Sequence, residues 1–279
     1  FGRDDFRAIV GQPLGLMYGF KQDGFYSFDD FTFDGTQNRW LLNEGVVDVS
    51  KVMSRSGNYF GPGHIKLEKL GGEGQIITLE DDRMVIGQAQ PKHTGGLMLN
   101  VQYKSFDLAS MFNWSYGNDI YNADKIDFMA YEGSKRYQNI SNEMRLSQRF
   151  TTINPATGAN IMFGNDANSE LFRTLNEGKT MWNPMAANGR ILTDWAIEDG
   201  SFLRLSNVTL GYTLPTHIAK RLLMQNLRIY IAGYNLHVWT KYSGQDPEVD
   251  TQRNPLTPGV GYSAYPKARK VLFGLNVTF

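Results

Sequence analysis

The sequence predicts an all-β protein, specifically a transmembrane antiparallel up-and-down β-barrel with long extracellular loops. Three observations predict this fold. Apolar and polar residues alternate with a period of two in several segments, as in strands with two unlike faces. The connections between these segments alternate between short and long, which is typical of outer-membrane barrels. Aromatic residues gather at the segment ends, where such barrels meet the two membrane interfaces.

Six segments carry the strand signal. The looser three are residues 16–26, with Leu16, Tyr18 and Phe20 expected to point outward, and residues 202–213 and 227–239. Residues 97–103 and 106–116 alternate more strictly and are separated only by Lys104 and Ser105, which predicts a β-hairpin. The sixth segment, residues 271–279, is the clearest, with strict alternation over nine residues.

We expect the apolar residues of the three clear segments to line one continuous outward surface. These residues are Leu97, Leu99, Val101, Phe106, Leu108, Phe112, Val271, Phe273, Leu275 and Val277. The opposite face is expected to carry Asn100, Gln102, Asp107, Asn113, Asn276 and Thr278.

The connections predict an up-and-down order. Lys104–Ser105 is one short turn, and residues 214–226 form another, with a short helix expected to begin at Pro215–Thr216 and run through Lys220 and Leu223. The other three connections are long, at roughly residues 27–93, 117–201 and 240–269. Soluble domains rarely contain structureless loops of this length. With short turns at the periplasmic end, every long loop falls outside.

Composition narrows the functional classes. The 279 residues include 28 basic and 28 acidic side chains, so the formal net charge is zero and nucleic acid is not an expected partner. The absence of cysteine excludes thiolate catalysis and cysteine metal sites within this chain. The sequence contains no run of 18 apolar residues, so it predicts no membrane-spanning helix. A membrane β-barrel does not need such a run, because its strands alternate between apolar and polar residues. The N-terminal residues look like the middle of a longer chain, so we expect a fragment.

The sequence supports no enzyme site. The four histidines, His64, His93, His217 and His237, lack a metal-binding spacing. Glu80, Asp81 and Asp82 are interpreted as solvated loop charges, and Ser115 and Ser201 have no triad partners at informative spacing. Gly71, Gly72 and Gly74 lack the lysine of a phosphate loop. The aromatic residues Trp182, Trp195 and Tyr242 and the segment 244–250 suit either sugar stacking or loop packing. No substrate-binding, metal or cofactor site is therefore assigned.

Several motifs, spread in order over most of the chain, resemble the SusC/RagA-type TonB-dependent outer-membrane transporters. They are the segments GQPLG (11–15) with YGF (18–20), DR (82–83) with VIG (85–87), PKHTGGL (91–97), NWSYGNDIYN (113–122), DGSFLRL (199–205), LGYTLP (210–215), NL (235–236), GQDPE (244–248) and YP (265–266).

This resemblance implies a 22-stranded barrel in which residues 1–279 supply the last six strands, the C-terminal part of the barrel domain. It also implies a plug and a TonB-binding segment outside this chain, and a surface lipoprotein of the SusD type as partner. The function implied is energised import of nutrients, oligosaccharides or peptides, across the outer membrane of a Gram-negative cell. Six strands cannot close a barrel, and open edges are not stable in lipid, so this chain alone is not expected to transport.

One segment departs from the family pattern. Many relatives carry an acidic, calcium-like loop of the form Asp-x-Asn-x-Asp-Gly before Asp82 and Arg83. Here the corresponding run is residues 69–74, with Lys69 at the first ligand position and Gly71 at the third. At least two oxygen ligands are missing, so no calcium is expected.

A second hypothesis of a different class is a soluble or surface-attached all-β module that binds carbohydrate or acts as an adhesin. The location of the apolar faces distinguishes the two, because a barrel presents them to lipid whereas a sandwich packs them against each other.

The terminal strand generates a prediction about assembly. Barrels resembling this one usually end in an aromatic residue, and the barrel assembly machinery recognises the final amphipathic strand; here the candidate signal is Phe273, Leu275, Val277 and Phe279. An alternating strand with a free edge can add to another edge by backbone pairing. Phe279→Asp should lower the amount of folded full-length protein in the outer membrane, measured as heat-modifiable mobility on gels. Substrate preference should be unchanged in the fraction that assembles. Normal assembly of the variant would remove the signal from Phe279.

Overall fold

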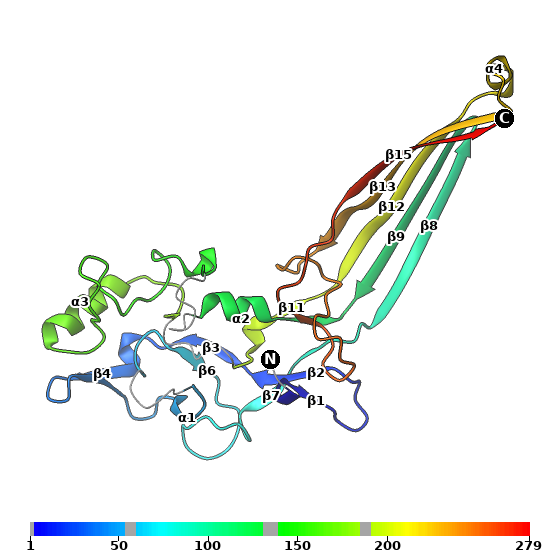
Figure 1. The fold of residues 1–279 in the computed structure, drawn as a ribbon. Coiled ribbons are helices and arrows are strands. Elements are labelled where there is room, and N and C mark those ends of the chain that lie inside the picture. The colour runs from blue at the N-terminus through cyan, green and yellow to red at the C-terminus, as the bar shows by residue number, and fades with distance from the viewer. Residues whose placement is uncertain (1–2, 54–59, 131–138, 185–190) are drawn as a thin grey trace. The chain divides into compact units, whose positions relative to one another are not determined.

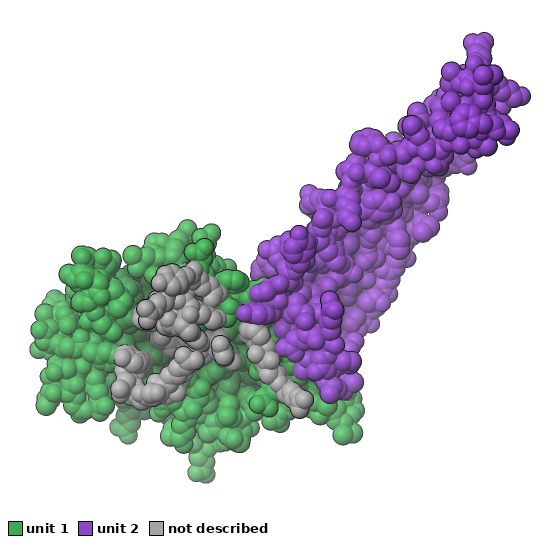
Figure 2. Space-filling model, in the orientation of Figure 1, with its two compact units in different colours: residues 1–12, 16–87, 121–197 green, residues 13–15, 88–120, 198–279 purple. Residues whose placement is uncertain are grey.

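The computed structural model describes residues 3–53, 60–130, 139–184 and 191–279. The chain divides into two compact units (Figure 2). Unit 1 comprises Phe1–Gln12, Leu16–Gly87 and Tyr121–Ile197, and unit 2 comprises Pro13–Gly15, Gln88–Ile120 and Glu198–Phe279. No helix among the described residues is long and apolar enough to span a membrane.

Unit 2 is dominated by one antiparallel sheet of five strands, ordered β15-β13-β12-β9-β8 (Figure 1). Its strands are β8 (His93–Tyr103), β9 (Phe106–Tyr116), β12 (Phe202–Thr213), β13 (Asn226–Thr240) and β15 (Lys270–Thr278). Five of the six expected strands are therefore confirmed, and these five pair with one another in the expected up-and-down order. Within the described residues this sheet does not close, because β8 and β15 each have one unpaired edge.

Both short connections lie at the same end of this sheet, which we call the turn end. Lys104 and Ser105 join β8 to β9, with Tyr103 opposite Phe106. Lys104 has a φ of 53°, the left-handed conformation that tight hairpins require. The connection from β12 to β13 contains helix α4 (Thr216–Arg221), which confirms the predicted short helix. The long connections leave from the opposite end, the loop end (Figure 1). The predicted alternation of short and long connections holds within this sheet.

A β-bulge keeps the sheet two-faced along β12. The pairing of β12 shifts between Leu205 and Asn207 relative to both neighbouring strands. Without that extra residue, Leu203 and Leu205 would fall on the opposite face from Val208 and Leu210. The bulge explains why the alternation in this segment looks loose in the sequence.

Unit 1 corrects two sequence-based expectations. Residues 16–26 were expected to form one barrel strand with Leu16, Tyr18 and Phe20 outward, but they form β2 (Leu16–Phe20) and β3 (Gln22–Phe25). Strand β2 pairs with β1 (Phe6–Arg7) and β7 (Arg83–Gln88), and β3 pairs with β6 (Ile65–Leu67). Leu16 and Phe20 are buried, not outward. The apolar side chains of β2 are therefore buried by other parts of the protein, whereas the alternation in the sequence predicted contact with lipid.

The segments 27–93 and 117–201 were expected to be long loops, but most of their described residues are packed around a core of unit 1. Its largest cluster is Phe20, Tyr26, Phe31, Trp40, Val49, Met53, Leu67, Ile77, Phe150, Ile161, Met162 and Phe172. Aromatic rings meet edge to face in this cluster, for example Tyr26 and Phe31 at 5.5 Å between centroids. These residues have no sustained periodicity in the sequence, so their core could not be predicted from it.

The remaining elements are short. They are strands β4 (Phe31–Asp34), β5 (Arg39–Leu42), β10 (Asp119–Asn122), β11 (Ile197–Asp199) and β14 (Val260–Gly261), α-helices α1 (Ser50–Met53), α2 (Ala123–Met129) and α3 (Asp166–Asn176), and 3₁₀ helices η1 (Arg3–Asp5), η2 (Phe28–Asp30), η4 (Asn142–Met144) and η5 (Asp194–Ala196). Strands β4 and β5 form a hairpin, and β11, β10 and β14 form a small sheet.

Helix α3 shows how this irregular chain satisfies its polar groups. The side chain of Asn165 accepts a hydrogen bond from the backbone N–H of Asn168 at 3.1 Å and caps the helix N-terminus. At the other end, buried Asn176 accepts from the N–H of Thr151 at 2.7 Å and donates to the carbonyl of Thr151 at 2.9 Å. The buried side-chain amide of Asn176 thereby joins the helix to the loop at Thr151, which lies outside the named strands.

Candidate functional site

One face of the five-stranded sheet is apolar from edge to edge. Cross-strand partners share a face, so the register traces this surface from Leu97 through Phe112 to Leu205. Closer to the turn end it runs from Leu108 through Leu210 and Ile231 to Phe273. Its residues are Leu97, Leu99, Val101, Phe106, Leu108, Phe112, Leu203, Leu205, Val208, Leu210, Leu227, Ile229, Ile231, Val271, Phe273, Leu275 and Val277. The predicted one-sided apolar surface is confirmed.

Among the described residues, no second sheet covers this apolar face. Leu97 is 58% exposed, Phe273 76% and Leu275 65%. Soluble monomers rarely expose such a continuous apolar surface, so this face needs a cover of similar chemistry. The sandwich alternative requires the apolar faces of two sheets to meet, and the exposure of these side chains argues against it.

Aromatic side chains border the apolar face at both ends. His93 stacks on Tyr116 with 5.1 Å between ring centroids and accepts a hydrogen bond from Trp114 Nε1 at 3.2 Å. His237 contacts Trp239 at the same loop end, and Phe106 contacts Tyr212 at the turn end. The ten residue steps from Phe106 to Tyr116 span about 33 Å, or about 25 Å in height for a strand tilted by about 40°. That height matches the apolar band of an outer-membrane barrel.

The opposite face of the sheet carries polar side chains and charge pairs, together with the apolar side chains of Met98, Met111 and Leu272. Arg228 on β13 reaches across β12 to Asp107 on β9, with Nε to Oδ1 at 2.9 Å. Gly211 lies beneath this bridge, and a Cβ there would meet both side chains at 2.4 Å. Glycine at this position therefore leaves the space that the ion pair needs. Asn100, Gln102, Asn113, Asn276 and Thr278 share this face, as predicted.

At the loop end of the polar face, four charged side chains form a network. Arg204 on β12 is 5% exposed and lies within 2.7 Å of Asp246 and 2.8 Å of Glu248. Lys267 lies 2.7 Å from Glu248 and 3.8 Å from Asp246. Arg204 also donates to the side-chain oxygen of Asn235, whose amide donates in turn to the carbonyl of Lys267 at 3.1 Å. The network fastens residues 246–248 and 267–268 to the sheet.

A second buried charge pair lies in unit 1, between Lys69 and Asp82, in the segment for which the sequence predicted no calcium. The Asp82 side chain is fully buried and accepts from Lys69 Nζ at 2.9 Å and from the N–H groups of Thr78 at 2.8 Å and Leu70 at 2.9 Å. Lys69 Nζ also donates to the carbonyl of Ile76 at 3.0 Å. The Lys69 ammonium thus supplies a positive charge inside this loop. The interpretation of Asp82 as a solvated loop charge was wrong.

The pKa of Asp82 is set by two opposing effects. Burial favours the neutral acid and raises the pKa, but the donors from Thr78, Lys69, Leu70 and Gly71 outweigh it and hold the pKa below the ordinary value for aspartate. A depressed pKa stabilises the folded state above the unfolded pKa, and this contribution is lost as the pH falls through the folded value. Asp82 therefore stabilises the loop throughout the neutral range.

The other residues singled out from the sequence have structural contacts. The Ser201 hydroxyl accepts from the N–H of Gly117 at 2.9 Å, and Ser115 donates to Asn118 at 2.8 Å. Trp182 and Tyr242 are buried, and Trp182 packs against Trp195 at 4.8 Å, so packing is favoured over sugar stacking for these rings. His64 is buried beside Gly61, and burial lowers its pKa to about 4. No cluster of three metal-ligating side chains occurs in the described parts of the chain.

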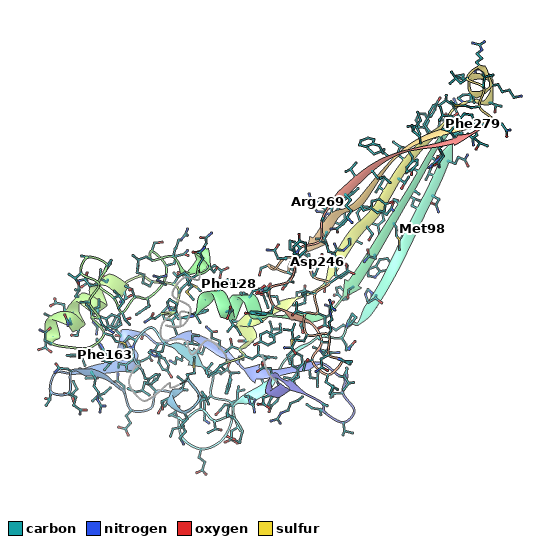
Figure 3. All side chains as sticks on the ribbon, viewed as in Figure 1. Met98, Phe128, Phe163, Asp246, Arg269 and Phe279 are labelled. Carbon is teal, nitrogen blue, oxygen red and sulfur yellow. The ribbon has the colours of Figure 1, made fainter. Side chains whose placement is uncertain are left out.

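The predicted assembly residues lie together at one edge of the sheet. Phe273, Leu275 and Val277 point to the apolar face of edge strand β15, and Phe279 follows the strand and is 79% exposed. Figure 3 shows Phe279 at the turn end, with Asp246 and Arg269 at the other end of unit 2. Their role in assembly stays a prediction.

Comparison with curated proteins gives relatives along the whole chain. TonB-dependent receptor P3 of Formosa agariphila is 27% identical over 274 residues, which is 96% of this chain and 22% of the receptor. TonB-dependent receptor SusC of Bacteroides thetaiotaomicron is 26% identical over 186 residues, 66% of this chain and 15% of SusC. The homologues of this chain are TonB-dependent receptors. The predicted resemblance is confirmed, and the chain spans about a quarter or less of these relatives.

Comparison with solved structures agrees at the level of the fold. Structures of the RagAB peptide transporter and of the RagAB peptide importer in its closed-closed state match 99% of this chain, with TM-scores of 0.60 and 0.59. Sequence identities are 18% and 20%, and this chain covers 24% of each matched chain. No family model matches the sequence.

The two faces of the sheet can be distinguished by lipid contact. We expect a fluorophore attached to Leu275→Cys to be quenched by nitroxide-labelled lipids when the full-length protein, freed of other cysteines, is reconstituted. The same label on Asn276→Cys, one residue along β15 and on the opposite face, is the matched control and should escape quenching. Equal quenching at both positions would contradict the assignment of the faces.

The Lys69–Asp82 pair predicts a local stability effect. Lys69→Met leaves a buried carboxylate without its charge partner and should destabilise the loop 69–82 by about 3 kcal/mol. Hydrogen exchange of the Leu70, Gly71 and Thr78 amides in the full-length protein measures it. Lys66→Met is the control, because the Lys66–Asp30 pair is partly exposed and separated by 3.3 Å, so its loss should cost about 1 kcal/mol or less. A chelator should leave the exchange unchanged; faster exchange in chelator would instead indicate a bound metal.

Proposed function

We propose that this chain is part of an outer-membrane TonB-dependent importer of nutrients, of which residues 1–279 form the C-terminal part of the barrel domain. The observation that carries this proposal is the five-stranded sheet, with an uncovered apolar face bordered by aromatic residues and a polar face on the other side. Such a sheet suits a barrel wall between the lipid bilayer and an aqueous lumen. The homologous TonB-dependent receptors support the same function.

The open edges of the sheet indicate what the rest of the protein supplies. In the part of the chain that the structure describes, strands β8 and β15 each leave a row of backbone groups unpaired, and such groups must be satisfied within a membrane. In the proposed 22-stranded barrel, further strands pair with both edges. The plug, and through it TonB, belong to the remaining three quarters of the protein, and the barrel assembly machinery inserts the whole.

The proposed partner is a SusD-like surface lipoprotein that captures nutrient outside the cell. SusC is among the relatives, and the matched RagAB structures are named as a peptide importer. Oligosaccharides are the proposed cargo, with peptides as the alternative. The homologues are receptors, which supports a transport function for this chain and not an enzymatic one.

Uptake in cells tests the proposal. Deleting the gene for the full-length protein should abolish uptake of the labelled oligosaccharide or peptide that it imports, and deleting TonB should have the same effect. Re-expression of the full-length protein is the control. Purification in mild detergent should also recover a SusD-like lipoprotein. A stable and active transporter consisting of these 279 residues alone would contradict the proposed barrel.

A further inference from the structure

A concave site lies on the polar face of the five-stranded sheet, at its loop end. Its volume is about 830 Å³, within the range of small-ligand sites. Its lining comes from four adjacent strands, β9, β12, β13 and β15, and from the connection between β13 and β15: Asn113, Arg204, Ser206, Tyr234, Asn235, Glu248, Tyr265, Pro266, Lys267, Ala268 and Lys270. The apolar face is on the other side of the sheet, so this site faces the proposed lumen.

The wall of the site is formed by the charge network already described, and that wall is neutral. Two cations, Arg204 and Lys267, pair with two anions, Asp246 and Glu248. Arg204 and Asp246 are buried, and their pairing leaves little charge for a ligand. The network therefore acts as a rigid frame.

Lys270 supplies a positive charge that the neutral network of Arg204, Asp246, Glu248 and Lys267 does not offer to a ligand. It is exposed and has no carboxylate within 4 Å among the described residues, although its side chain lines the site. Tyr234 is its cross-strand partner on β13 and is 39% exposed. Tyr265, five residues before Lys270, is 92% exposed. One unpaired ammonium and two open aromatic rings thus line the same concave site.

We propose that this site binds a singly charged acidic group of the imported oligomer, with Lys270 pairing with a carboxylate. The rings of Tyr234 and Tyr265 contact the apolar faces of the sugars or residues next to the acidic group in the oligomer. Tyrosine suits this role, because its ring is apolar and its hydroxyl group stays in water. The net charge of one matches a single carboxylate, and Lys270, as a mobile point charge, accepts it without fixed geometry. The inference rests on the proposed function and deepens it, because it names the cargo as acidic.

Binding to the full-length protein in detergent tests the site with two matched probe pairs. One pair is a hexamer of uronic acid and a neutral hexamer of glucose; the other is a hexapeptide with two glutamates and its glutamine counterpart. The wild type should bind the acidic member of one pair at least about fivefold more tightly, and added salt should reduce the preference. The pair that shows the preference identifies the cargo as carbohydrate or peptide.

Variants then assign the preference to the site. Lys270→Met should abolish the preference and leave binding of the neutral probe unchanged, and Lys270→Arg should restore it. Tyr265→Ala should weaken both members of the preferred pair. Lys220→Met, which removes an exposed charge from helix α4 at the turn end, is the matched control and should bind like the wild type. Heat-modifiable mobility confirms that each variant is folded.

The outcomes separate this inference from the proposed function. Equal binding of acidic and neutral probes by the wild type would overturn the acidic site while leaving import intact. A preference that survives Lys270→Met, or that is lost equally in Lys220→Met, would also overturn it. If the wild type binds none of the probes and its deletion changes no uptake, the proposed function fails and the acidic site fails with it.

Discussion

Backbone pairing across the five-stranded sheet decides which environment each side chain reaches. Because successive residues of a strand point to opposite faces, one consistent register separates the aliphatic surface from the polar one. The bulge between Leu205 and Asn207 belongs to this constraint, since it returns Val208 and Leu210 to the face of Leu203. The aromatic borders, the Asp107–Arg228 bridge and the Arg204 network all take their positions from this register.

Two glycines make room for large side chains on the polar face of the sheet. Gly211 leaves room for the Asp107–Arg228 bridge, and at Gly274 a Cβ would meet the ring of Tyr230 on the neighbouring strand at 2.2 Å. A glycine beneath an aromatic side chain lets the ring lie flat over the backbone, which recovers packing that glycine alone would lose. The polar face therefore contains side chains held in fixed positions. Such side chains can form a binding site in addition to lining the inner surface of the proposed barrel.

The sequence predicted the regular part of the molecule and missed the irregular part, for a physical reason. The strands around Lys104–Ser105 and the terminal strand alternate strictly, because one face is apolar and the other polar. The prediction for residues 16–26 failed since alternation reports two unlike environments without saying whether lipid or protein forms the apolar one. The core around Tyr26, Trp40 and Phe172 is built from short elements whose contacts are far apart in the chain. Their periodicity is too brief to detect.

The candidate site shows the same limit. The motif at residues 244–248 was visible, but nothing in it says that Asp246 and Glu248 meet Arg204 and Lys267, because these contacts form only when a loop returns to the sheet. The sequence alone therefore does not show which of these charges are paired, whereas the fold divides them into paired and unpaired. Two acids neutralise two bases, and Lys270 remains open beside Tyr234 and Tyr265. In the proposed site, cargo is selected by the groups that folding leaves unpaired, since a charge already satisfied within the wall gains little from a ligand.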